Sequence, residues 1–503
     1  MAAKSINVTD PVTGRSAVIT YEEIDDAEEQ EKNRIARNKK YKLYWQYYDG
    51  EQYDKENQEH REYLRLKENQ RLPEEDRLHA YSGIIEDGVD FITDQLMEGM
   101  GIEVKTEAEL KSGEPAEEIP EEQSKFQEMW DVSDMDLEAP DLTREALVSA
   151  ESYILLKWDE VNQIVKFLPY EAESVCPVYS SINHKRMIMA TIYSSQYDAE
   201  IDEELEIREQ YVLAKTSEGY MECVYLKFTG DNEDPVEGKL LNIGFIPIIH
   251  LRAIRKKVRR SFGDSLIKRL IGDTDRYNAV NQHEYQISRY NSGSHLAIFG
   301  TESNVEPSQL LLGGEANDCW AFPNTSEVKT MTLPTETAMM DSQCGKLEKN
   351  MYRKMGIQKI DLEEIKGMGA PSGYALEIIN RKTDGVFTRI QKELSKGYIT
   401  LFGYALDMQA IMEGKKPWYD TDPLKTYPNR TIKLTFGSVF IADSEAIRQD
   451  YVAGLISRKR ALMLKGYSEL EAQEMAEEAE EDEANRNAAE LEGMGISRRN
   501  NQE

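Results

Sequence analysis

The stretch from Ile246 to Glu413 decides the fold that this sequence predicts. It begins with IPIIHLRAIRKKVRRSFG (residues 246–263), in which an apolar run gives way to a basic one. A helix-like pattern follows over 262–291, and a glycine-punctuated, β-type segment follows over 292–333. The first half of the stretch therefore predicts a helix that leads into a small β insert.

The second half of the stretch predicts two more helices with a glycine loop between them. An amphipathic helix opens at Pro334 and runs to about Met355. The loop ends in GMGAPSG (residues 367–373), and a helix with one apolar stripe runs from there to about Met412. Glycines interrupt this long helix at positions where we expect kinks: Gly385, Gly397 and Gly403.

The acidic charge of the chain limits the partners that it can hold tightly. Its 503 residues include 93 acidic and 61 basic side chains, for a formal net charge of −32. Such a field opposes tight non-specific binding to nucleic acid, yet it permits DNA to pass nearby with weak adhesion. No secretory signal or transmembrane span is predicted, because residues 1–10 lack an apolar core and no apolar run reaches about 18 residues.

No motif in the chain predicts a catalytic, cofactor or metal site. GMGAPSG follows an acidic segment, 361–366, whereas a dinucleotide site needs an apolar strand before its glycines. The sequence contains no GxxxxGK[ST], GxSxG or HExxH, and its four distant cysteines indicate neither a disulfide framework nor a zinc site. The scattered histidines are interpreted as structural: His60, His79, His184, His250, His283 and His295. We expect no enzyme activity, cofactor or metal.

The N-terminal part of the chain predicts an extended arm and then a long charged helix. Residues 1–20 form the arm, and the helical pattern runs from Tyr21 to about Leu72. Its segment KKYKLYWQYY (residues 39–48) interleaves lysines with aromatic rings. The rings either stack on nucleic-acid bases or pack on a neighbouring element while the lysines reach solvent. We favour packing, because acidic residues flank the segment on both sides.

Residues 80–250 predict an α+β domain with a mostly antiparallel sheet. A helix capped by Ser82 and ended by Gly99 carries one apolar face. A short strand over 102–104, a solvated loop over 106–123 and a helix from Thr143 follow. Two apolar runs around a polar gap predict a hairpin, and more strands succeed it: 153–158 with 164–168, then 174–179, 187–193, 209–214, 220–228 and 239–241. A further strand is expected over 430–440.

The helix that opens at Pro334 has two opposite faces. One face is apolar and suits a neighbouring helix: Met340, Cys344, Leu347, Met351 and Met355. The other is basic: Lys346, Lys349 and Arg353. The basic face is interpreted either as an ordinary solvent face or as a surface for an anionic partner.

Short segments, in their order along the chain, carry a family resemblance. They are YWQYYDG (44–50), DFITDQL (90–96), IPII with the basic run and SLI (246–267), SGYAL (372–376), IADSE (441–445) and GLIS (454–457). Over about residues 40–485 this ordered set resembles the portal, or head-to-tail connector, proteins of tailed bacteriophages. No single segment is diagnostic, so the order of the set carries the resemblance.

The resemblance implies a mixed α+β subunit with the parts of a portal protein. The first part of the chain would form an N-terminal arm (1–20) and the wing (21–261). The middle would form the stem helices (262–291 and 334–356), a small β-containing clip between them (292–333) and the tunnel loop (357–373). The last part would form the long kinked helix and return strand of the wing (374–440), the crown helices (441–490) and a disordered tail (491–503). The subunits would assemble as a ring, typically of twelve copies.

The resemblance also implies a place and a set of partners. The ring would occupy one capsid vertex of the virion after assembly in the bacterial cytoplasm, and double-stranded DNA would pass through it during packaging and ejection. Its protein partners would be the terminase large subunit, head-completion or adaptor proteins, and the major capsid and scaffolding proteins, with no membrane contact.

The channel residues form a separate hypothesis. We expect basic side chains to face the DNA and to make weak, evenly spaced phosphate contacts around the ring: Lys346, Lys349, Arg353, Lys359 and Lys366. The tunnel loop would contain Asp361, Glu363, Glu364, Gly367, Met368 and Gly369. If its carboxylates line the pore they would repel phosphate, with Lys359 and Lys366 as the nearby positive charges.

Two other functional classes remain open. One is an oligomeric virion or scaffold protein without a DNA channel, for which the purified protein would fail to form a closed ring. The other is an enzyme with an unrecognised site, for which nucleotide binding by the purified protein would be the first sign.

Overall fold

The computed structural model divides the chain into two compact units. Unit 1 comprises Met1–Lys42, Val89–Ser265 and Ile365–Glu503, and unit 2 comprises Leu43–Gly88 and Leu266–Glu364. The residues described are 5–9, 15–20, 27–52, 82–98, 100–105, 119–180, 183–198, 203–216, 219–230, 234–255, 261–292, 295–299, 319–322, 328–331, 338–357, 373–419, 427, 429, 431–436 and 458. The mixture of helices and strands confirms the expected α+β class.

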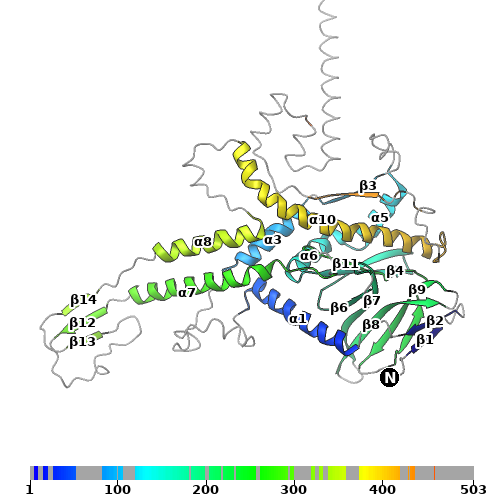
Figure 1. Cartoon of the computed structure of the whole chain (residues 1–503), viewed down its shortest axis with the longest axis horizontal. Helices are drawn as coiled ribbons and strands as arrows, with labels where there is room; N and C mark the ends of the chain where they lie inside the picture. The colour runs from blue at the N-terminus through cyan, green and yellow to red at the C-terminus, as the bar shows by residue number, and fades with distance from the viewer. Residues whose placement is uncertain are drawn as a thin grey trace, which may run out of the picture. The chain divides into compact units, whose positions relative to one another are not determined.

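A seven-stranded antiparallel sheet dominates the described part of unit 1 (Figure 1). Its strands are β1 (Ser5–Thr9), β2 (Ser16–Thr20), β6 (Val175–Tyr179), β7 (Met187–Asp198), β8 (Glu203–Thr216), β9 (Met221–Thr229) and β10 (Glu237–Leu240). The order is β1-β2-β8-β7-β6, with β9 on β8 and β10 on β9. The predicted strands β6 to β10 are confirmed, and β7 and β8 extend several residues beyond the predicted bounds.

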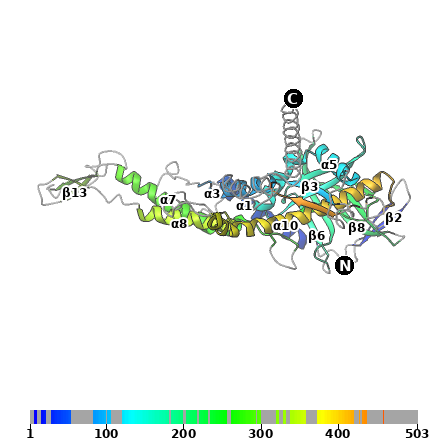
Figure 2. The same ribbon diagram turned by 90° about the horizontal axis from the view of Figure 1, so that it is seen from above.

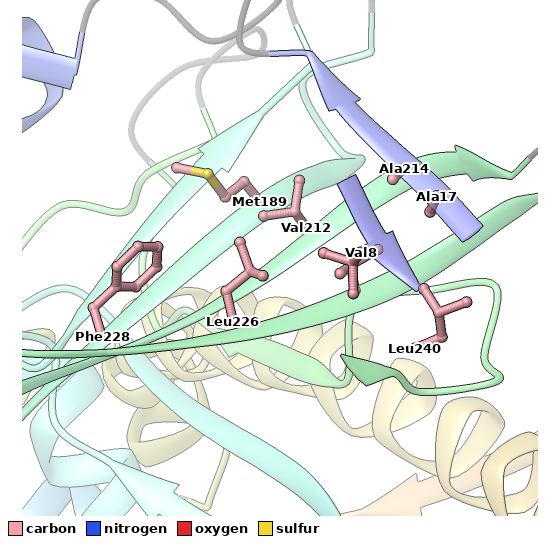
Figure 3. Close-up of a cluster of buried hydrophobic side chains, with 9 residues drawn as sticks. Val8, Ala17, Met189, Val212, Ala214, Leu226, Phe228 and Leu240 are labelled. Atoms are coloured by element: carbon pink, nitrogen blue, oxygen red, sulfur yellow. The ribbon is translucent and has the colours of Figure 1, made fainter. Parts of the chain in front are cut away.

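The N-terminal segment, expected as an extended arm, contains β1 and β2, and β2 pairs with β8 of the large sheet. Figure 3 shows Val8 and Ala17 over the side chains of the large sheet. Both are buried with a cluster that includes Met189, Val212 and Leu226. Successive residues of a strand face opposite sides, so Val8 of β1 and Ala17 of β2 face this core, and burial of their side chains holds the segment in place.

A three-stranded sheet in the order β11-β4-β5 forms the second layer of unit 1. The predicted hairpin is confirmed as β4 (Ser152–Asp159) and β5 (Ile164–Tyr170), and β11 (Ile248–Leu251) pairs with β4. The long helix α10 (Gly373–Met412) crosses this sheet and bends along its course (Figure 1). Gly397 permits the close approach, because a Cβ there would lie 2.3 Å from Leu251 Cδ2.

Two helices differ from the sequence prediction. The expected loop over 106–123 gives way to α5 (Glu121–Val132) directly after Pro120, and α6 (Met135–Val148) begins eight residues before the predicted Thr143. The predicted start lies after Pro140, and proline is unfavourable inside a helix. In the structure α6 includes Pro140 and buries one apolar stripe, which consists of Met135, Ala139, Leu142 and Ala146. The strand predicted over 102–104 is confirmed as β3 (Gly101–Lys105), which pairs with β15 (Thr431–Thr435).

Unit 2 contains a helical hairpin with a small sheet between its helices. In both views α7 (Ile271–Ser292) and α8 (Ala338–Met355) lie side by side (Figures 1 and 2). Between them in the chain come β12 (His295–Phe299), β13 (Cys319–Phe322) and β14 (Val328–Met331), in the order β13-β12-β14. The unit boundary falls within α1 (Ala27–Asp49) and within α3 (Ile84–Met97).

The first helix of this hairpin begins later than its predicted start at residue 262. A 3₁₀ turn, η4 (Ile267–Arg269), precedes α7. Before it, Gly263 forms a β-bridge with Arg255 and Asp264 N donates to Ile254 O at 3.0 Å. These backbone bonds replace the helical ones at 262–264, because tertiary pairing overrides local helical pattern.

The aromatic residues of α1 support packing over nucleic-acid contact. Tyr41, Tyr44, Tyr47 and Tyr48 are buried, and the neighbouring lysines of the segment are exposed. Within unit 2, Tyr47 Oη donates to Asp275 Oδ1 at 2.8 Å. These four tyrosine rings are therefore not available to stack on bases.

Candidate functional site

The predicted apolar stripe of α8 packs against α7. Cys344, Met351 and Met355 are buried. Cys344 Sγ donates to Asn281 Oδ1 at 2.9 Å, and Thr274 Oγ1 lies 3.4 Å from Met351 Sδ. These contacts confirm the apolar face that the sequence predicted and fix the rotation of α8 about its axis.

An ion pair fixes the end of the hairpin that holds the α8 C-terminus. Lys354 Nζ lies 2.7 Å from Asp273 Oδ2 and also donates to Arg269 O at 3.1 Å. Nearby, a Cβ on Gly88 would lie 2.3 Å from Met355 Sδ, so glycine lets the two backbones approach closely. Lys354 thus links α8 to the start of α7.

The predicted basic face of α8 lies on its exposed side. Lys346, Lys349 and Arg353 are all exposed, about half a turn away from the buried stripe. Arg353 Nη2 donates to Asn350 Oδ1 at 2.9 Å, a bond within the same helix. The structure therefore brings these three side chains together on one surface that α7 does not cover.

The other predicted site residues lie outside the described residues. They are Lys359, Lys366, Asp361, Glu363, Glu364, Gly367, Met368 and Gly369. The crown helices expected over 441–490, apart from Arg458, and the tail over 491–503 also lie outside them.

A carboxylate pair occurs on the same helical hairpin. A hydrogen bond with Asp341 of α8, burial and the charge of Asp341 raise the pKa of Glu284 in α7. Burial raises the pKa of Cys344, and the neighbouring carboxylates add to this effect. Near this pair the α7–α8 surface is acidic, so the basic face occupies only part of α8.

Unit 1 contains a buried polar cluster around Glu151, whose side chain is 3% exposed. Tyr153 Oη donates to Glu151 Oε2 at 2.6 Å, and His250 Nε2 lies 3.5 Å from the same oxygen. The Tyr179 hydroxyl forms a hydrogen bond with His250 Nδ1. Arg37 of α1 lies over the Phe262 ring at 4.7 Å and adds a positive charge.

The charges in this cluster balance one another. Burial favours the neutral form of Glu151, but hydrogen bonds and the charges of His250 and Arg37 hold its pKa below the ordinary value. Burial lowers the pKa of His250, against the opposing effect of Glu151. The hydrogen bond and charge of His250 thus act first on the pKa of Glu151, and Arg37 adds a further positive charge.

Sequence reasoning interpreted His250 as structural and missed its carboxylate partner, Glu151. The sequence did contain one sign of a buried carboxylate: Glu151 lies just before the predicted strand 153–158. His250 lies within another strand, β11. Strand pairing then brings β11 beside β4. Periodicity within one strand cannot reveal such a pair.

A cavity of about 410 Å³ lies beside this cluster in unit 1, between the β6–β7 turn, β11 and α10. Its charged lining residues are Lys185, Arg186, Arg252, Arg255, Lys396 and Glu393. Its aromatic lining includes Phe245 and Tyr404, whose ring centroids are 4.2 Å apart. The arrangement suits an anionic ligand better than a cationic one.

Among the described residues, no group of three or more His, Cys, Asp and Glu side chains could hold a metal ion. The described helices also include none long and apolar enough to span a membrane. No protein-family model and no curated protein sequence matches the chain.

Proposed function

We propose that this chain is the subunit of a ring-shaped portal through which double-stranded DNA enters and leaves a bacteriophage capsid. In this proposal the protein is not an enzyme. It forms a conduit of about twelve copies and a docking site for the terminase large subunit and the head-completion proteins.

The observation that carries the proposal is the construction of unit 2. Two helices, α7 and α8, form a hairpin, and a small three-stranded sheet occupies the chain between them. In a portal ring such helices would be the stem and the sheet would be the clip. The 40-residue α10 and the sheets of unit 1 fit the wing of the same kind of subunit.

The distribution of charge supports passage of DNA over tight binding. Twelve copies at −32 would repel phosphate and prevent tight adhesion. Lys346, Lys349 and Arg353 form an exposed basic face on α8. Repeated around a ring, this face would offer weak, equally spaced contacts to phosphates, which suits a duplex that must slide.

Electron microscopy of the purified full chain is the first test of the proposal. We expect closed rings with a central hole about as wide as a DNA duplex. Monomers or open filaments, in the presence and absence of a scaffolding protein, would contradict the portal function. Closed particles without a hole would favour the alternative, an oligomeric virion or scaffold protein.

A second test addresses the channel residues. Rings of the K346Q/K349Q/R353Q variant should bind a short duplex more weakly than wild-type rings. The slope of log affinity against log salt concentration should fall by about 0.9 for each phosphate that the variant no longer neutralises. The matched control, K268Q/R269Q/R276Q, removes equal charge from exposed positions of η4 and α7. Equal reductions in affinity for both variants would show that the α8 face has no special role.

A further inference from the structure

The cavity beside α10 concentrates positive charge in an acidic chain. Five basic side chains line it against one carboxylate, that of Glu393. Lys396 Nζ already pairs with Glu393, and Arg252 Nη2 lies 3.8 Å from it. Lys185 and Arg186 are exposed, and within the described ranges neither pairs with a carboxylate. The cavity therefore has surplus positive charge that a partner would neutralise. We name it the basic cavity.

A complementary surface lies where α5 meets α6. It consists of Asp131, Asp134, Asp136 and Glu138 around Val132 and Leu137, and we name it the acidic joint. Among the described residues none of the four carboxylates pairs with a basic side chain. Leu137 is 76% exposed and Val132 is 41% exposed. The joint therefore offers two exposed apolar side chains beside four carboxylates that a basic partner could neutralise.

The two surfaces lie on opposite flanks of α10. The α10 residues that line the basic cavity include Lys396, Thr400 and Tyr404. On the other flank, Tyr398 packs on Trp130 of α5, with 6.0 Å between ring centroids. A helix therefore separates the basic cavity from α5, so one copy of the chain cannot fill its own cavity with its own acidic joint.

The three-stranded sheet gives the same separation. Residues of β11, at one edge of the sheet, line the basic cavity. At the other edge, Phe167 N of β5 donates to Ser133 Oγ, between α5 and α6, at 2.9 Å. Surfaces at opposite edges of one rigid layer can meet only between copies, in a head-to-tail contact.

We propose that the basic cavity receives the acidic joint of a second copy of this chain. Asp131 and Glu138 of one copy would neutralise Lys185 and Arg186 of the next, and Leu137 would enter the cavity beside its aromatic lining. Each such contact leaves one cavity and one joint free, so the contact repeats into a ring or a filament. This inference rests on the proposed ring and identifies the surfaces that join its subunits.

Charge reversal of the full-length chain tests the pairing. We expect K185E/R186E and D131K/E138K each to lower the fraction of assembled protein at least tenfold at low salt, as measured by mass photometry. The variant that combines all four changes restores opposite charges across the contact, so it should assemble again. An equimolar mixture of the two separate variants should also assemble, because each offers a partner to the other.

Several outcomes would overturn the inference. Assembly of K185E/R186E at the wild-type level would exclude the basic cavity, and failure of the combined variant to assemble would exclude the acidic joint as its occupant. The control K215E/K239E removes as much positive charge from the large sheet and should assemble normally. Circular dichroism and melting temperature show whether each variant is folded, and an unfolded K185E/R186E is replaced by K185Q/R186Q, for which a partial loss of assembly is expected.

Two further results separate this inference from the proposed function. If wild-type protein and K185E/R186E both form closed rings with a DNA-sized hole, the portal proposal stands and the proposed subunit contact is wrong. Calorimetry gives the second result. If inorganic phosphate binds to wild type but not to K185E/R186E, and neither phosphate nor the substitutions change assembly, the cavity is a small-anion site and the inference is also wrong.

Discussion

The two units of this protein use charged side chains in opposite ways. In unit 1, Glu151 and His250 are almost completely buried. In unit 2, Lys346, Lys349 and Arg353 share an exposed face of α8. Breaking a buried charge pair costs several kcal/mol because the remaining charge stays desolvated, whereas an exposed charge contributes little to stability. The buried charges therefore contribute to the fold, whereas the exposed ones lie on a surface that solvent reaches.

The largest expected effect is at the buried pair. Glu151→Gln should lower the free energy of unfolding by about 3–5 kcal/mol, because the buried His250 and the half-buried Arg37 would lose the carboxylate charge that they face. Urea denaturation of the full chain measures this value. Glu128→Gln is the matched control, since that carboxylate is 55% exposed and pairs with Lys125 at the surface. A difference between the two variants of less than about 1 kcal/mol would contradict the contrast between the units.

The next effect depends on pH and concerns Glu145 of α6. Burial raises its pKa to about 7 from 4.5, although Ala172 N donates to its Oε1 at 3.1 Å. The folded state holds the proton more tightly than the unfolded chain does. The stabilising contribution of protonated Glu145 is therefore fully present below pH 4.5 and is lost as the pH rises through about 7. This loss lowers the free energy of unfolding by about 3 kcal/mol.

Glu145→Gln should remove this loss, because the amide keeps an acceptor oxygen and cannot ionise. The unfolding free energy of the variant, relative to wild type, should rise by about 3 kcal/mol between pH 4.5 and pH 8. In wild type and variant alike, the lowered pKa of His250 removes stability as the pH falls below 6.5. This effect is the same in both proteins, so it cancels in the difference between them. Parallel pH profiles for variant and wild type would exclude a buried, protonated Glu145.

A packing effect of intermediate size is expected in α10. Gly397→Ala should cost about 1–3 kcal/mol, because the new methyl group would meet Leu251 of β11. Gly385→Ala in the same helix has nothing within 4 Å of its added Cβ and should be neutral or stabilising by up to about 1 kcal/mol. Thermal melting distinguishes the two. Equal shifts would mean that α10 does not rest on β11 at Gly397.

Gly397 also shows what the sequence could and could not predict. The length and the apolar stripe of α10 were predictable because a helix repeats its pattern every few residues. The glycine was interpreted as a kink, whereas its role depends on a strand more than a hundred residues earlier in the chain. The hairpin of β4 and β5 was predicted for the same local reason, and α5 was missed because charged residues surround its few buried ones.

The candidate sites follow the same rule. The two faces of α8 were predictable, since both lie in one helix, and the structure confirms which of them is buried. The Glu151–His250 pair and the basic cavity were not, because their residues come from separate segments that only the folded sheets and α10 bring together. Whether the basic face of α8 meets DNA stays a prediction.

The smallest effect on stability is expected from K346Q/K349Q/R353Q, which completes the contrast with Glu151. The unfolding free energy should change by less than about 1 kcal/mol, because all three side chains are exposed. Most of that change should come from Arg353, since a positive charge in the last turn of α8 interacts favourably with the helix dipole. Urea denaturation of the single R353Q variant separates this part. A loss of stability above about 2 kcal/mol would show that the face supports the fold, and a DNA-binding defect of the triple variant would then no longer indicate direct contact with phosphate.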